Sequence, residues 1–170
     1  MSLVLISLII AASIYLLYNA VAIGIFGIPP SLSETYYLYK GKWNIGFVFP
    51  IMMYLVVGFM MPAWLTLSEG SPFQFLSFLA PASIAFVGTA PAFKSSSLEN
   101  SVHSVAAIVA AICSLLWVIL VTPYWWIIIL ALLVFALVAL LTRTLSYAKI
   151  YWLETVAFIS TFMSAILMSM

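Results

Sequence analysis

Six long apolar stretches constrain this chain more than any other feature of its sequence. A helix that crosses a bilayer needs about 20 mostly apolar residues. The stretches run over residues 3–26, 44–66, 72–92, 101–121, 124–142 and 150–169. Pro123 separates the fourth from the fifth, because proline lacks the N–H that continues a helix and disfavours helix at the residue before it. The spacing predicts one all-α domain over residues 1–170, a polytopic transmembrane bundle of six helices.

Charge is too scarce for a soluble domain. Of the 170 residues, 5% are charged and 67% are hydrophobic, whereas soluble domains carry about 25% charged residues. The net charge of +1 leaves no basic patch for phosphate backbones. These numbers exclude a soluble domain, a disordered chain and a nucleic-acid-binding protein. We therefore expect a lipid bilayer to be the surroundings of this chain.

The basic residues predict how the chain sits in that bilayer. All five lie in the first, third and fifth connections between the stretches: Lys40, Lys42, Lys94, Arg143 and Lys149. Cytoplasmic loops of membrane proteins carry an excess of Lys and Arg. The pattern predicts a multi-pass protein of the cell (inner) membrane with both termini outside.

The first connection contains a polar segment that has two interpretations. Ser31 and Glu34 have the S-x-x-E spacing of a capping box, and Tyr36 and Tyr37 follow. One interpretation is a short interfacial helix with its tyrosines at the level of the lipid headgroups. The other is a polar lid in which Ser33, Glu34 and Tyr36 close over a site.

The third connection leads into the fourth stretch with a second polar cluster. Ser96 or Ser97 is expected to cap the helix, and Glu99 in its first turn suits the helix dipole. Glu99 and His103 are four residues apart and share a helix face, which continues as a stripe of small residues typical of close helix packing. The stripe comprises Ala106, Ala107, Ala110 and Ser114. His103 is either a hydrogen-bonded structural residue or a proton relay or ligand.

Glu154 forms the third cluster, about one turn into the last apolar stretch. A carboxylate in such a helix is costly unless it is neutralised, paired or wetted. Its expected partners are Lys149, Arg143 and His103, all predicted near the same membrane surface. A functional and a structural role both stay open for Glu154.

Together the three clusters predict a polar vestibule that opens to the cytoplasm. The expected ligand-binding residues are Glu154, His103, Glu99, Ser33, Glu34, Tyr36 and Lys149. With one histidine and one cysteine, Cys113, the chain offers no multi-histidine or multi-cysteine metal set. No metal or other cofactor is expected.

Four short segments carry a resemblance to a known group of proteins. They read PSLSETYY (30–37), FVGTAPAFK (86–94), ENSVH (99–103) and WLE (152–154). The chain resembles small uncharacterised six-helix integral membrane proteins of bacteria and their phages, which implies a fold and a membrane but no activity. A remoter likeness is to the membrane hydrolases that include alkaline ceramidases and progestin-type receptors. Those use an aspartate and several histidines around zinc, and this chain has no aspartate and one histidine, so we expect no zinc hydrolase of that pattern.

Three functions remain open on the sequence. The favoured one is a non-enzymatic protein that binds or moves a small solute or lipid through the vestibule. The second is a membrane-embedded enzyme acting on lipid, with Glu154 or His103 as general base and Ser33 or Tyr36 assisting. It is less favoured because no nucleophile elbow, metal set or phosphate loop is present. The third is a homo-oligomeric pore or structural partner, with contacts at the small-residue stripe and at Ala20 and Gly24.

Overall fold

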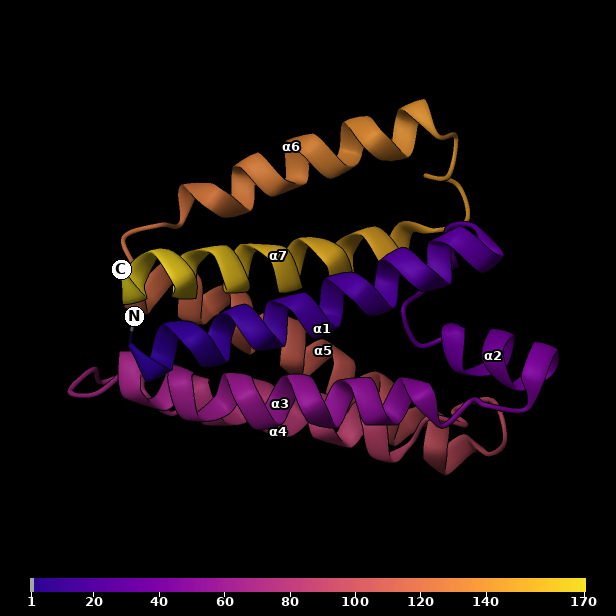
Figure 1. The fold of residues 1–170 in the computed structure, drawn as a ribbon, viewed down its shortest axis with the longest axis horizontal. Helices are drawn as coiled ribbons and strands as arrows, with labels where there is room; N and C mark the ends of the chain where they lie inside the picture. The colour runs from indigo at the N-terminus through magenta and orange to yellow at the C-terminus, as the bar shows by residue number, and fades with distance from the viewer. Residues whose placement is uncertain (1) are drawn as a thin grey trace.

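Seven helices account for most of the described part of the chain, residues 2–170, in a computed structural model (Figure 1). They are α1 (Leu3–Phe26), α2 (Thr35–Trp43), α3 (Val48–Leu67), α4 (Leu76–Thr89), α5 (Ser97–Val121), α6 (Trp126–Leu141) and α7 (Lys149–Ser169). The all-α prediction is confirmed. Each predicted apolar stretch overlaps one of the six longer helices, and α2 is a seventh helix within the first connection.

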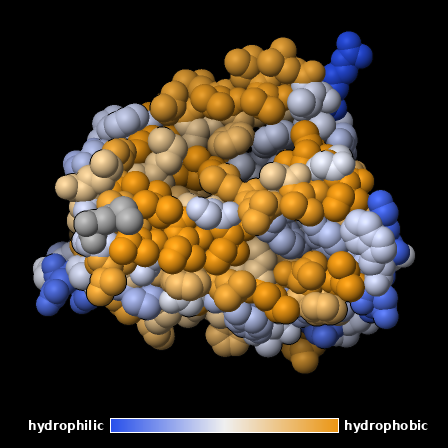
Figure 2. All heavy atoms as spheres, in the orientation of Figure 1, coloured by the Kyte–Doolittle hydropathy of each residue, from blue (hydrophilic) through white to orange (hydrophobic). Residues whose placement is uncertain are grey.

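Four of these helices are long and apolar enough to cross a membrane: α1, α3, α5 and α7. The helices α4 and α6 are also apolar but have only 14 and 16 residues. Figure 2 shows hydrophobic residues over most of the face in view, with the most hydrophilic ones at its two ends. The structure therefore fits a helical membrane protein, and the number of six crossings stays a prediction.

The longer helices run side by side, with α6 at the outer edge of the bundle (Figure 1). The helix α1 packs on α3 and α7, and α5 packs on α4 and α7, whereas α6 packs mainly on α7. Much of α6 is exposed, including Leu133, Leu137 and Leu140. Because α6 has no polar side chain between Ile127 and Leu141, this exposure fits a lipid-facing helix.

The core lies between α1, α3, α4, α5 and α7. Two fully buried tryptophans lie in the part of the core near the C-terminal ends of α3 and α5: the rings of Trp64 and Trp117 stack with their centroids 4.9 Å apart. The indole N–H of Trp117 donates to the hydroxyl of Ser68 at 2.7 Å. This contact fixes α5 against the end of α3.

Three helices differ from their predicted bounds by three or more residues, each for a local reason. The helix α5 begins at Ser97 rather than 101, because the Ser96 hydroxyl accepts the N–H of Glu99 at 3.2 Å and caps the helix. The helix α3 begins at Val48 rather than 44, because Asn44 adopts a left-handed φ of 57° that ends α2. The helix α4 spans only Leu76–Thr89 of the predicted 72–92, since turns with hydrogen bonds three residues apart precede it.

Candidate functional site

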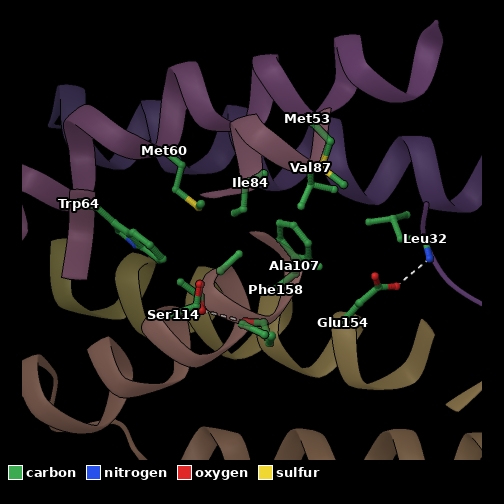
Figure 3. A pocket seen from close by; sticks show the side chains of 14 residues that line it. Leu32, Met53, Met60, Trp64, Ile84, Val87, Ala107, Ser114, Glu154 and Phe158 are labelled. Carbon is green, nitrogen blue, oxygen red and sulfur yellow. Dashed lines mark hydrogen bonds between the residues drawn. The ribbon is translucent and has the colours of Figure 1, made fainter. Parts of the chain in front are cut away.

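A cavity of about 50 Å³ lies between α3, α4, α5 and α7, next to the segment that precedes α2. Its walls are almost entirely apolar, and Figure 3 shows Trp64 and Glu154 toward its opposite ends. A buried water needs roughly 10–15 Å³ of such space, so the cavity has room for a few waters or part of an apolar chain. The lining residues are Leu32, Met53, Met60, Trp64, Ile84, Val87, Ala107, Ala110, Ala111, Ser114, Glu154, Ala157, Phe158 and Thr161.

Small residues of α5 leave this space open. The stripe that was expected to pack closely against other helices borders the cavity at Ala107, Ala110 and Ser114. Ala110 and Ser114 are also buried, as is Ala106. Most of the stripe is therefore buried within the chain, and part of it faces a cavity instead of a helix backbone.

Glu154 supplies the only ionisable group of the lining. One carboxylate oxygen, Oε2, accepts the backbone N–H of Leu32 at 2.7 Å (Figure 3). No described residue donates to the other oxygen, and the single ion pair within residues 2–170 joins Lys94 to Glu34. The prediction that Lys149, Arg143 or His103 pairs with Glu154 is therefore wrong.

The hydrogen bond from Leu32 also holds the first connection against α7. The N–H of Tyr151 donates to the carbonyl of Pro30 at 3.1 Å, one turn before Glu154. Leu32 is fully buried beside these contacts and lines the cavity. Glu154 thus fastens the segment that closes this end of the cavity and presents an acceptor to the interior.

His103 is buried outside the cavity lining, with both ring nitrogens hydrogen-bonded. Its Nδ1 lies 2.9 Å from the carbonyl oxygen of Ala90, and its Nε2 lies 2.8 Å from the hydroxyl oxygen of Ser33. Because a carbonyl only accepts, Nδ1 carries the hydrogen, and the neutral ring then accepts the Ser33 O–H at Nε2. The ring also stacks on Phe93, with centroids 4.5 Å apart. His103 therefore joins α5 to the segments before α2 and after α4.

Glu34 and Glu99, two of the predicted ligand residues, have side-chain partners outside the cavity. The Glu34 carboxylate pairs with the ammonium of Lys94 at 2.6 Å. The Glu34 N–H donates to the Ser31 hydroxyl at 3.2 Å, so one half of the expected capping box forms and the carboxylate half does not. Glu99 accepts the hydroxyl of Ser95 near the surface.

The remaining predicted ligand residues also lie outside the cavity. The Tyr36 ring lies 5.6 Å from the ammonium of Lys40, and Lys149 is the first residue of α7. Of the seven predicted ligand residues, Glu154 alone lines the cavity, and Ser33 and His103 bond to each other. The structure divides the predicted polar residues among separate places, and the enclosed space is apolar.

Sequence reasoning missed most of the lining. Met53, Met60 and Ile84 look like core residues of any helical bundle, because apolar residues at helical spacing do not reveal whether their neighbours fill the space. One signal was available for Phe158, which lies four residues after Glu154 and so shares its helix face. Thr161, seven residues after Glu154 and so near the same helix face, also lines the cavity.

Residues 2–170 contain no group of three or more His, Cys, Asp or Glu that could hold a metal ion. Comparisons with known proteins give no family: no protein-family model matches the chain, and no curated protein or solved structure is significantly similar to it. The resemblance to six-helix membrane proteins of bacteria and phages therefore stays a prediction.

Proposed function

We propose that this membrane protein binds or moves a small amphipathic solute or lipid at the cavity beside Glu154. The observation that carries the proposal is a carboxylate without a cationic partner at one end of an otherwise apolar space. Ligand sites are typically apolar with a few polar groups that fix orientation. An ionisable residue within a membrane-spanning helix is by default a functional candidate.

The chemistry of the lining defines the ligand class. An ionised carboxylate only accepts hydrogen bonds, so the ligand presents an ammonium or hydroxyl group to Glu154. Methionine, isoleucine and phenylalanine side chains surround the rest of the space, and they favour a hydrocarbon chain. A carboxylate ligand is disfavoured, because two like charges would meet in an apolar place.

The proposed setting is the cell (inner) membrane, with both termini outside and the Glu154 end of the cavity toward the cytoplasm. Basic residues support this orientation, because all five lie in or beside the connections at the α2 end of the bundle (Figure 1). A ligand would then reach Glu154 from the cytoplasmic side.

Quenching of Trp64 fluorescence by brominated alkyl probes tests the proposal. The probes are 8-bromooctylamine, 8-bromooctanol and 8-bromooctanoate, added to the purified protein in lipid nanodiscs. We expect saturable quenching by the amine and the alcohol, with the bromine near Trp64, and none by the carboxylate. Glu154→Gln should lower the preference for amine over alcohol about fivefold or more, because hydrogen bonds to charged groups are roughly twice as strong as neutral ones.

Two further variants make the result decisive. Ala110→Leu narrows the cavity, whereas Ala136→Leu adds the same side-chain volume on the exposed surface of α6. The proposal requires that Ala110→Leu and Trp64→Phe remove the saturable quenching and that Ala136→Leu does not. Equal behaviour of the two leucine variants would overturn it.

A lipid-acting enzyme is the second candidate function, favoured by the hydrogen bond between Ser33 and His103. The serine hydroxyl lies 2.8 Å from Nε2, and the carbonyl of Ala90 orients the ring from its other side. A serine that is hydrogen-bonded to an oriented histidine is the arrangement that activates a serine hydroxyl as a nucleophile. This candidate requires that a lipid-soluble fluorophosphonate label the wild-type protein and fail to label Ser33→Ala; absence of wild-type labelling at millimolar reagent argues against it.

A further inference from the structure

We propose that a lipid-facing groove between α1 and α3, beside α2, holds an acyl chain of an anionic phospholipid whose headgroup meets Lys40 and Lys42. The groove has about 380 Å³ of open space, far more than the cavity at Glu154, and shares no lining residue with it. This site is therefore independent of the proposed function.

The walls of the groove suit a hydrocarbon chain. Leu17 and Val21 of α1 face it from one side and Ile51 and Leu55 of α3 from the other. All four are large apolar side chains that are more than 40% exposed. The lining extends along α1 from Ile14 to Val21, which is about 10 Å at the rise of a helix. The groove is long enough for much of an acyl chain.

Aromatic rings connect the groove to the surface at its α2 end. Tyr18 and Tyr39 line the groove, and their ring centroids lie 5.8 Å apart. The ring centroids of Tyr39 and Phe26 lie 5.0 Å apart. The hydroxyls of Tyr18 and Thr35 lie 2.5 Å apart, which ties α2 to α1. Burial raises the pKa of Tyr39 above its ordinary value, so its phenol is uncharged at neutral pH and places no negative charge beside a phosphate.

Lys40 and Lys42 place positive charge at this end, and neither has an acidic partner among the described residues. The Lys42 ammonium lies 5.5 Å from the Phe26 ring and 4.8 Å from the Trp43 ring, next to the aromatic chain that leads into the groove. Lys40 lies over Tyr36 on the same helix. Neither lysine forms an ion pair among the described residues, and α2 contains no acidic residue.

These charges select the occupant. Tyrosine and tryptophan rings lie at the level of the lipid headgroups, and lysines near a membrane surface attract anionic headgroups. A zwitterionic lipid would fill the apolar groove equally well but would leave the two lysines without a net negative partner. Phosphatidylglycerol is a suitable probe, because it combines an acyl chain with one net negative charge.

Native mass spectrometry of the protein released from mixed nanodiscs tests the site. The nanodiscs contain equal amounts of phosphatidylglycerol and phosphatidylcholine with identical acyl chains. We expect the wild-type protein to retain phosphatidylglycerol preferentially. Each lysine near an anionic surface contributes about fivefold, so Lys40→Gln/Lys42→Gln should lower the preference about 25-fold at low salt.

A second double variant of equal charge and a variant within the groove distinguish a specific lipid site from general attraction between basic residues and anionic lipid. Arg143→Gln/Lys149→Gln removes the same charge at the same end of the bundle, and we expect it to keep the preference. Val21→Trp should remove one tightly held lipid of either kind, with the helical content checked by circular dichroism. The proposal fails if the wild type shows no preference, if both double variants lose it equally, or if Val21→Trp retains every lipid.

Discussion

At the scale of single residues, His103 and Glu154 near the α2 end differ in their hydrogen-bond partners. His103 has a neutral partner at each ring nitrogen, contributed by residues 13 and 70 positions away. Glu154 has one backbone donor, from residue 32, and no cationic partner. Because of this difference, Glu154 is the candidate for contact with a ligand in the cavity, and His103 enters only the second candidate function, together with Ser33.

Replacing His103 should destabilise the protein through the partners that it leaves behind. His103→Ala leaves the hydroxyl of Ser33 and the carbonyl of Ala90 unpaired and opens a void beside Phe93. We expect a loss of about 2–4 kcal/mol in the free energy of unfolding, measured by titration with sodium dodecyl sulfate. Ser104→Ala, one exposed residue further along α5, should cost less than about 0.5 kcal/mol. Equal losses for the two variants would contradict the buried hydrogen bonds.

At the scale of elements, the sequence predicted the six longer helices because their apolar length is a local property. The predicted ends of these helices were less accurate, because a capping residue such as Ser96 or a left-handed residue such as Asn44 decides where a helix begins or ends. Of the two interpretations of the first connection, the structure shows a helix with aromatic and basic residues over Thr35–Trp43. The stripe on α5 was assigned to helix contact from its small residues, but only the packing of α3, α4 and α7 shows that it borders a cavity.

At the scale of the whole molecule, the two termini lie at one end of the bundle and α2 lies at the other (Figure 1). The connections that contain basic residues lie at the α2 end, and the connection with Glu69 lies at the opposite end. Two termini at the same end agree with a chain that crosses a bilayer an even number of times. The direction of insertion stays a prediction, which rests on the positive-inside rule alone.

Cysteine labelling in intact cells checks that direction. Cys113→Ser gives a background without cysteine, into which Ser71→Cys or Ser146→Cys is introduced at opposite ends of the bundle. We expect a membrane-impermeant maleimide to label residue 71 directly and residue 146 only after the cells are permeabilised. The reverse pattern would place the Glu154 end of the cavity outside the cell.

The sequence by itself determined the class of fold and the separation of charge between the two ends, because apolar length and the order of basic residues along the chain are local or one-dimensional. It also identified Glu154 as a costly carboxylate in an apolar helix. Only the tertiary structure decided that Leu32 bonds to Glu154, that Ser33 bonds to His103, and that an apolar cavity rather than a polar vestibule lies between the helices. Those contacts join residues 122 and 70 positions apart, and they depend on distances of a few ångströms between helices, which the packing of the entire bundle sets.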